Sequence, residues 1–126
     1  MKMHLQRNSD ANLITAYAPG SITINEHAHH SSLVVAPGWL VSPWAPARFE
    51  DLQAADFTVI LEHRPEVLLL GTGRRLRFPP AATLAAFRER QIGVEVMDTA
   101  AACRTYNILM GEDREVIAAL LLIETD

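Results

Sequence analysis

The stretches Val67-Leu-Leu-Leu-Gly-Thr-Gly73 and Gly93-Val-Glu-Val-Met-Asp-Thr99 decide the fold. Each contains a short apolar run that is followed at once by residues typical of a turn or a helix start. An apolar run without alternation is typical of a parallel strand that is buried on both faces. A third run of this kind, Val116–Ile123, lies further along the chain. We therefore expect Val67–Leu70, Val94–Met97 and Val116–Ile123 to form neighbouring parallel strands.

The segments between these runs carry helix signals. Pro79-Pro80 suits a helix start, and Leu84 and Phe87 would form the inner face of that helix. Gly93 would cap its end. The second segment, Asp98–Gly111, predicts a helix that begins with a capping Asp-Thr pair. The order strand, helix, strand, helix, strand gives two βαβ units, which almost always cross over right-handed and build a parallel sheet covered by helices.

The first half of the chain is built differently, from short β-leaning runs separated by turn residues. Leu13–Ala18 and Ser21–Ile24 flank Pro19-Gly20, and Ser32–Ala36 and Trp39–Val41 flank a second Pro-Gly pair. Such pairs are strong turn signals. This half therefore predicts antiparallel hairpins.

Two further features stay open. Asp56 could cap a short helix that carries Phe57, Ile60 and Leu61 on one face, whereas Thr58-Val59-Ile60 would equally suit a strand. Trp39 and Trp44 suit a protein interface as well as the edge of a core.

Length and composition indicate one soluble domain over residues 1–126, of which residues 1–11 are expected to be poorly ordered. The expected fold class is α/β, a three-layer-like domain with a partly parallel central sheet (βαβαβ in the C-terminal half) and N-terminal antiparallel hairpins. The net charge of −4 argues against a nucleic-acid partner. The longest apolar runs are too short for membrane insertion, and residues 1–14 do not resemble a targeting peptide. We expect a cytoplasmic location, and the oligomeric state stays open.

A candidate ligand site lies where the parallel strands end, because open α/β sheets bind ligands along that rim. The backbone N–H groups there could hold an anion, Thr72 and Thr99 hydroxyls could orient it, and Arg74, Arg75 or Arg77 could supply charge. The candidate ligand-binding residues are Gly71, Thr72, Gly73, Arg74, Asp98, Thr99, Arg104 and Asn107. The alternative is that the glycines permit a tight turn and the arginines are solvated. A lone Gly-x-Gly lacks the third glycine of a dinucleotide fingerprint.

The predicted helix Asp98–Gly111 places Thr99, Cys103 and Asn107 on one stripe, with Tyr106 beside them. Cys103 is the only cysteine, so an internal disulfide is excluded. It lies inside an Ala-rich helix without a well-placed basic partner, which predicts a buried and unreactive thiol. Asn107 and Tyr106 suit structural hydrogen bonds, and we expect no catalytic residues.

The segment His27-Ala-His-His30 raises a metal hypothesis, because alternate strand residues share a face. Only Glu26 lies nearby as a further ligand, and histidines in polar loops are usually solvated. We therefore expect no metal and no cofactor.

Several spaced motifs resemble a known family. They are Leu68-Leu-Leu-Gly-Thr-Gly73, Gly93–Thr99, Ala102-Cys-Arg-Thr-Tyr-Asn-Ile-Leu109, Glu112-Asp-Arg114 and Ala118-Ala-Leu120, within a resemblance that covers roughly residues 12–123. The motifs resemble an uncharacterised α/β family of small bacterial and archaeal proteins that includes the mitochondrial NADH dehydrogenase complex I assembly factor 3. The resemblance implies a compact β/α/β domain with an added hairpin, and an assembly or protein-binding role without established enzymatic activity. His27–His30 is not part of the family pattern.

The sequence thus predicts a non-catalytic interaction or assembly module with a protein partner. The alternative is a small-molecule or anion-binding protein, or an enzyme, that uses the rim formed by Gly71–Gly73 and Asp98–Asn107. A filled rim with an exposed apolar patch elsewhere would favour the first, and a concave pocket with convergent polar groups would favour the second.

Overall fold

The computed structural model describes residues 10–125. We expected residues 1–11 to be poorly ordered, and positions 1–9 of that segment lie outside the described residues. The strands are β1 Ile14–Ala18, β2 Ser21–Ile24, β3 His27–His29, β4 Leu33–Ala36, β5 Trp39–Val41, β6 Val67–Gly71, β7 Gly93–Met97 and β8 Val116–Leu120. The α-helices are α2 Thr58–Glu62, α3 Ala85–Glu89 and α4 Thr99–Gly111, and the 3-10 helices are η1 Phe49–Asp51, η2 Ala54–Phe57 and η3 Ala81–Leu84.

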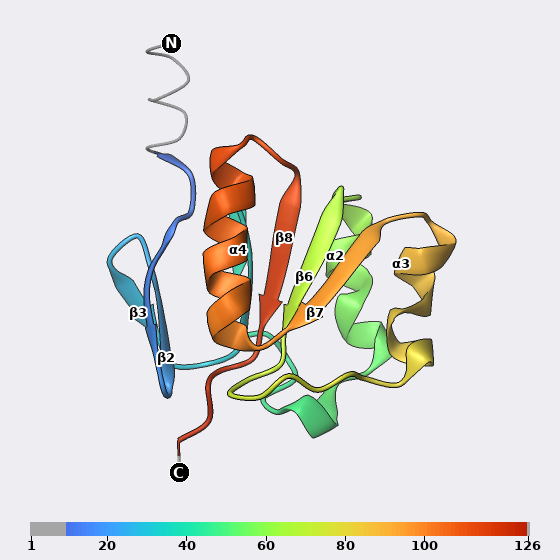
Figure 1. Ribbon diagram of the computed structural model, residues 1–126, viewed down its shortest axis with the longest axis horizontal. Helices are drawn as coiled ribbons and strands as arrows, with labels where there is room; N and C mark the ends of the chain where they lie inside the picture. Colours follow the sequence, from blue (N-terminus) through green and yellow to red (C-terminus); the bar gives the residue numbers. More distant parts are fainter. Residues whose placement is uncertain (1–9, 126) are drawn as a thin grey trace.

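The central sheet has five strands in the order β5-β4-β8-β6-β7 (Figure 1). β6 lies in the middle of a parallel group and pairs with both β7 and β8. The prediction that these three segments are neighbouring parallel strands is therefore confirmed. The last strand ends at Leu120 rather than at Ile123. Its ladder stops because the chain then turns toward the N-terminal hairpin, where Ile123 accepts a hydrogen bond from the Gly20 amide.

The predicted hairpins in the first half are also present. β1 and β2 pair antiparallel, as do β4 and β5. The two hairpins belong to different sheets, because β1, β2 and β3 form a separate three-stranded sheet while β4 pairs antiparallel with β8. The sequence did not predict that β4 extends the parallel sheet.

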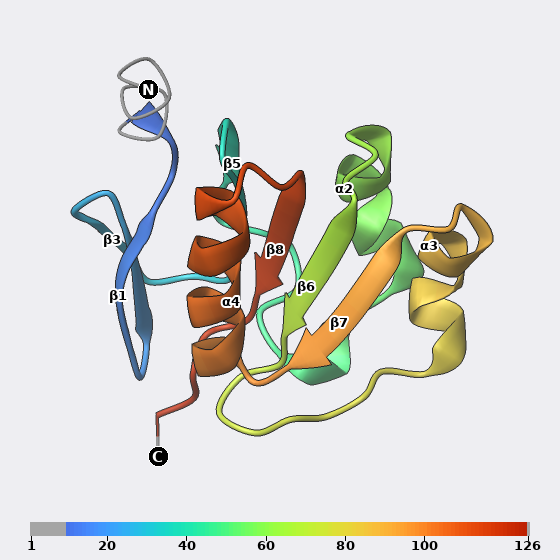
Figure 2. The same ribbon diagram turned by 45° about the horizontal axis from the view of Figure 1, so that its top comes forward.

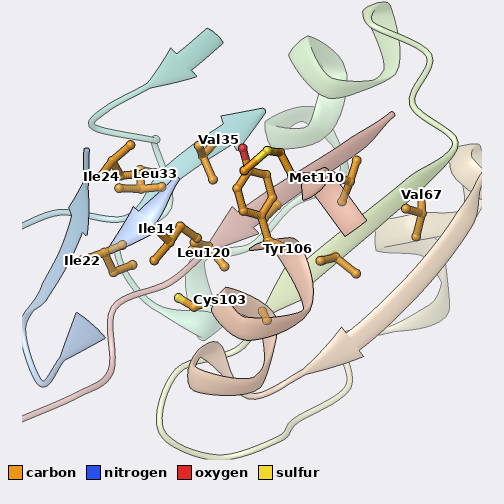
Figure 3. Packing of buried hydrophobic residues seen from close by; sticks show 14 residues of the cluster. Ile14, Ile22, Ile24, Leu33, Val35, Val67, Cys103, Tyr106, Met110 and Leu120 are labelled. Atoms are coloured by element: carbon orange, nitrogen blue, oxygen red, sulfur yellow. The ribbon is translucent and has the colours of Figure 1, made fainter. Parts of the chain in front are cut away.

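The layers follow from which face of the central sheet each apolar residue covers. α4 and the three-stranded sheet pack on one face, and α2 and α3 pack on the other, which confirms the three-layer α/β class (Figures 1 and 2). β6 and β8 are buried along their whole length, because their alternate side chains point into the two cores. Figure 3 shows Cys103, Tyr106 and Met110 of α4 in the core that lies between the central sheet and the layer of α4 and the three-stranded sheet.

The segment around Asp56 is helical, so the strand alternative does not hold. η2 begins with a reciprocal capping box in which the Gln53 amide donates to the Asp56 carboxylate at 2.8 Å. Trp44 is buried against Phe57, and its indole N–H donates to the Asp56 carbonyl at 3.1 Å. Trp44 therefore belongs to the core.

The helix predicted to run from Pro79-Pro80 to Gly93 is shorter than expected. It consists of η3 and α3 and ends at Glu89. Gln91 adopts the left-handed backbone conformation at φ 60°, and the Ile92 amide donates to the Phe87 carbonyl at 2.9 Å. This is a Schellman ending with glutamine in the usual glycine position. The prediction that Gly93 caps this helix was therefore wrong, because Gly93 begins β7.

Candidate functional site

The two segments that the sequence places at the rim are joined directly. The Thr72 amide donates to the Met97 carbonyl at 2.9 Å, and the Thr99 amide donates to the Gly73 carbonyl at 2.9 Å. β6 and β7 run parallel, so the turn after β6 and the start of α4 meet at one end of the sheet, the lower end in Figure 2. The loop that follows Gly73 and the chain after β8 leave from the same end.

The two rim threonines have fully buried side chains. Thr99 Oγ1 accepts from the Gly73 amide at 2.8 Å and donates to the Leu121 carbonyl at 2.7 Å. Thr72 Oγ1 donates to the Arg75 carbonyl at 2.7 Å and accepts from the Arg77 amide at 3.2 Å. Both hydroxyls are engaged inside the protein. They shape the turn and present no free group toward a ligand.

The two rim glycines are required for different reasons. Gly73 has a φ of 98°, a backbone conformation that residues other than glycine rarely adopt. A Cβ atom on Gly73 would also overlap the Glu124 carboxylate. Gly71 lies in β6 where a Cβ atom would come within 2.9 Å of Thr99 Oγ1. The Gly-x-Gly pattern therefore permits close packing of α4 and of the chain after β8 against the turn.

A carboxylate already lies at the predicted anion position. Glu124 Oε1 accepts from the Arg74 amide at 2.7 Å, and Glu124 Oε2 lies 3.4 Å from the Arg77 guanidinium. Arg77 also contacts Glu50 at 3.1 Å, and its guanidinium lies 4.5 Å from the centre of the Phe49 ring. The sequence pointed to the Arg74 region as an anion site but did not identify the anion, because Glu124 lies 50 residues away.

A cavity of about 260 Å³ lies beside this cluster. Its charged walls are Arg48, Arg77, Glu50 and Glu124, and its apolar walls include Phe49 and Leu121. The pKa of Glu50 is lowered, first by its own backbone N–H and then by Arg77. The cavity is therefore lined by balanced positive and negative groups. Of the predicted ligand-binding residues, Thr72 lines it.

Three other predicted residues make hydrogen bonds within the protein. The Asp98 carboxylate accepts from the Ala101 amide at 2.8 Å, which confirms the predicted cap of α4. Asn107 clamps the backbone of Ile14, accepting from its amide at 3.0 Å and donating to its carbonyl at 2.7 Å. The Arg104 guanidinium donates to the Tyr17 hydroxyl at 2.8 Å, a bond that raises the pKa of Arg104. Arg104 and Asn107 thus hold α4 against the three-stranded sheet.

The remaining chemistry-bearing residues lie away from the rim turn. Cys103 is buried, as predicted, and burial raises the pKa of its thiol to about 12. The Tyr106 hydroxyl donates to the Asn12 carbonyl at 2.7 Å, and burial raises its pKa as well. His29 Nδ1 lies 2.9 Å from the Ser42 hydroxyl, and His27 is exposed. Among residues 10–125, no three His, Cys, Asp or Glu side chains gather as a metal site.

A larger cavity of about 550 Å³ lies at the opposite end of the sheet, where β6 and β8 begin. The Trp39 and His63 rings form part of its wall and stack at 4.2 Å between centroids. Met110 and Arg114 line it from the end of α4 and the turn beyond it. The sequence showed Trp39 as an aromatic feature but gave no signal that His63 would meet it.

Apolar side chains are exposed on the loop that leaves the rim. Phe78 is 70% exposed and Leu76 is 50% exposed, next to the arginines that the sequence had singled out. Ile108 on α4 is 61% exposed. Within the part of the chain that the structure describes, no helix is long and apolar enough to cross a membrane.

The profile of a family described as "Protein of unknown function (DUF498/DUF598)" matches residues 14–121. The NADH dehydrogenase [ubiquinone] 1 alpha subcomplex assembly factor 3 of Danio rerio is 33% identical over 120 residues, which are 93% of this chain and 68% of that protein. The protein of the same name from Bos taurus is 34% identical, over 93% of this chain and 65% of its own length. These relatives are therefore longer than the chain. A Bordetella parapertussis crystal structure has 40% identity and a TM-score of 0.83, covering 89% of this chain and 96% of its own.

Proposed function

The chain belongs to the DUF498/DUF598 family, and from this membership we propose that it is an assembly factor that binds protein partners without catalysing a reaction. The name of the Danio rerio and Bos taurus relatives supports the assembly role. We extend it to this chain as a factor for respiratory complex I. The location that we propose is the cytoplasm, as the sequence suggested.

One observation carries the interaction part of this proposal. At the rim, the Thr72 and Thr99 hydroxyls are turned inward, whereas Phe78 and Leu76 on the adjoining loop are turned out to solvent. Aromatic side chains are enriched at protein interfaces, because each buries a large area when a partner covers it. We name Leu76 and Phe78 the apolar loop pair and propose that it contacts the partner.

The alternative function, a small-molecule binder or an enzyme at the rim, is favoured by the cavity beside Arg77. The candidate catalytic groups do not support an enzymatic reaction. The rim hydroxyls donate to backbone carbonyls, and the Cys103 thiol is buried with a raised pKa. A nucleophile needs access and an activating partner, which these groups lack.

The experiment is affinity capture of the tagged chain from its source cells, followed by mass spectrometry. We expect subunits of respiratory complex I in the captured material. The double variant Leu76→Ser/Phe78→Ser should lose them, because serine removes the apolar contact area without changing charge. Ile108→Ser is the matched control, since Ile108 is similarly exposed on α4 and lies outside the apolar loop pair.

Two results would contradict the proposal. Capture of no complex I subunit by the wild-type chain would exclude the assembly role. Equal capture by the wild-type chain and the double variant would exclude the apolar loop pair as the contact. A thermal shift with a small anion in the absence of any captured protein would favour the alternative function.

A further inference from the structure

We propose that the Arg74 amide and the Arg77 guanidinium form a carboxylate-binding site, which Glu124 occupies in the free protein. An acidic segment of a protein partner would take the place of Glu124 on binding. This inference rests on the proposed function, because it assigns a chemistry to the partner. It also requires that the chain after β8 can move aside.

The geometry of the Glu124 contact is that of a bound anion. One carboxylate oxygen accepts from a backbone amide beside the left-handed Gly73, and the other faces a guanidinium. Backbone N–H groups in such turns, together with arginine, are a common way to hold an anion. The partner's carboxylate would restore the same contacts and leave the charge balance of the site unchanged.

Arg77 is held ready for a carboxylate. Its ring contact with Phe49 and its ion pair with Glu50 fix the guanidinium from two sides. Its Nε atom is buried and has no hydrogen-bond partner among residues 10–125. An unpaired buried donor is costly, and a ligand that supplied an acceptor would relieve that cost. The adjoining cavity of about 260 Å³ offers room for such a group.

Glu124 is weakly held compared with the residues before it. Leu121 is 2% exposed, whereas the Glu124 side chain is 46% exposed. Beyond Leu121, the half-buried Leu122 packs against the core, the Gly20 amide donates to the Ile123 carbonyl, and Glu124 makes the contacts described above. Exposed hydrogen bonds and surface ion pairs of this kind contribute little stability. A competing carboxylate therefore has a low barrier to overcome.

The apolar side chains next to the site indicate which kind of carboxylate ligand it would bind. The site lies on the loop that also carries the apolar loop pair, so a ligand that reaches both must combine a carboxylate with apolar groups. An extended protein segment with an acidic residue flanked by apolar residues has this composition. A free small carboxylate would use the charged part of the site alone.

The test uses the full chain labelled with ¹⁵N, with the Arg74 amide resonance as the readout. Glu124→Ala empties the site, and Glu62→Ala is the matched control, because Glu62 is an exposed glutamate on α2. The probes are acetyl-glutamate amide and the peptide acetyl-Leu-Glu-Leu-amide. We expect Glu124→Ala to bind the peptide about tenfold more tightly than the wild-type chain, because the internal competitor is removed. Glu62→Ala should bind like the wild type.

Adding Arg77→Gln to Glu124→Ala should abolish binding. If that variant melts at a lower temperature, Arg77→Lys keeps the charge and should weaken binding through loss of the guanidinium fork. Equal affinity of the wild type and Glu124→Ala, or an Arg74 amide that does not respond in Glu124→Ala, would overturn the inference. Equal affinity for the two probes would overturn the protein-segment assignment.

These measurements use purified protein and synthetic probes, so they can succeed even if no complex I subunit is captured. Conversely, normal capture together with an unresponsive Arg74 amide would leave the proposed function standing and remove the carboxylate site.

Discussion

Thr99 Oγ1 at the start of α4 accepts a hydrogen bond from the Gly73 amide at 2.8 Å. The same hydroxyl donates to the Leu121 carbonyl, so one fully buried side chain joins the turn after β6, the helix and the chain after β8. The rim of the sheet is therefore held together by a threonine in the first turn of α4.

Replacing Thr99 by valine should destabilise the protein by about 2–4 kcal/mol, because it leaves a buried N–H and a buried carbonyl unpaired. Urea denaturation measures the change. Thr105→Val is the control, since Thr105 lies on the same helix and is only half-buried. A cost for Thr99→Val no larger than that of the control would show that the bridge contributes nothing.

Gly73→Ala should cost about 1–3 kcal/mol, because alanine is strained at φ 98° and its Cβ would displace Glu124. Gly111→Ala tests the same chemical change at the end of α4, where a Cβ atom meets nothing within 4 Å. We expect Gly111→Ala to leave the melting temperature unchanged or slightly raised. Similar melting temperatures for the two variants would contradict this account of Gly73.

Asn107→Leu should loosen the three-stranded sheet from α4. The substitution removes both hydrogen bonds to Ile14 and should cost about 1–3 kcal/mol. Hydrogen exchange of the Ile14 amide should become faster while the amides of β6 keep their protection. Asn25 makes comparable but exposed hydrogen bonds to Leu13 and Ala11, so Asn25→Gly, which suits the left-handed backbone at φ 47°, should cost less. An unchanged Ile14 amide would argue that packing alone holds this sheet.

Cys103 should react slowly with a thiol reagent at neutral pH, because the thiol is buried and its pKa is raised. Labelling should become fast and stoichiometric once the protein is unfolded in denaturant. Rapid labelling of the folded chain would show that Cys103 is reactive and would contradict this prediction.

The same burial gives a pH dependence. The ordinary pKa of the thiol is 9.0, and burial raises it to about 12 in the folded protein. Between these values the unfolded chain loses the proton and the folded chain keeps it, so stability must fall as pH rises above about 9. Cys103→Ala should show a shallower fall in melting temperature than the wild type. Parallel curves would mean that the thiol does not contribute.

Most of the sheet could be predicted from the sequence because its information is local. Apolar runs followed by glycine or by a capping aspartate predicted β6, β7 and α4, and Pro-Gly pairs predicted the hairpins. The pairing of β4 with β8 joins segments about 85 residues apart, and no local pattern records it. The end of α3 was misread because Gln91 takes the left-handed position that glycine usually fills.

The position of the candidate site could be predicted from the sequence, but the partners of its side chains could not. Strand direction placed Gly73 beside Thr99, whereas the side-chain partners depend on the folded chain. Asn107 was a candidate both for ligand binding and for structural hydrogen bonds, and the structure confirms the second, although its partner, the backbone of Ile14, carries no sequence signal. Glu124 was missed for the same reason, since nothing near it in the sequence indicates a contact with the Arg74 amide.

The most direct test of the assembly role is the amount of intact respiratory complex I in source cells that lack this protein, measured on native gels. We predict that complex I is depleted, that the wild-type chain restores it, and that Leu76→Ser/Phe78→Ser does not. Unchanged complex I in cells that lack the protein would contradict the account.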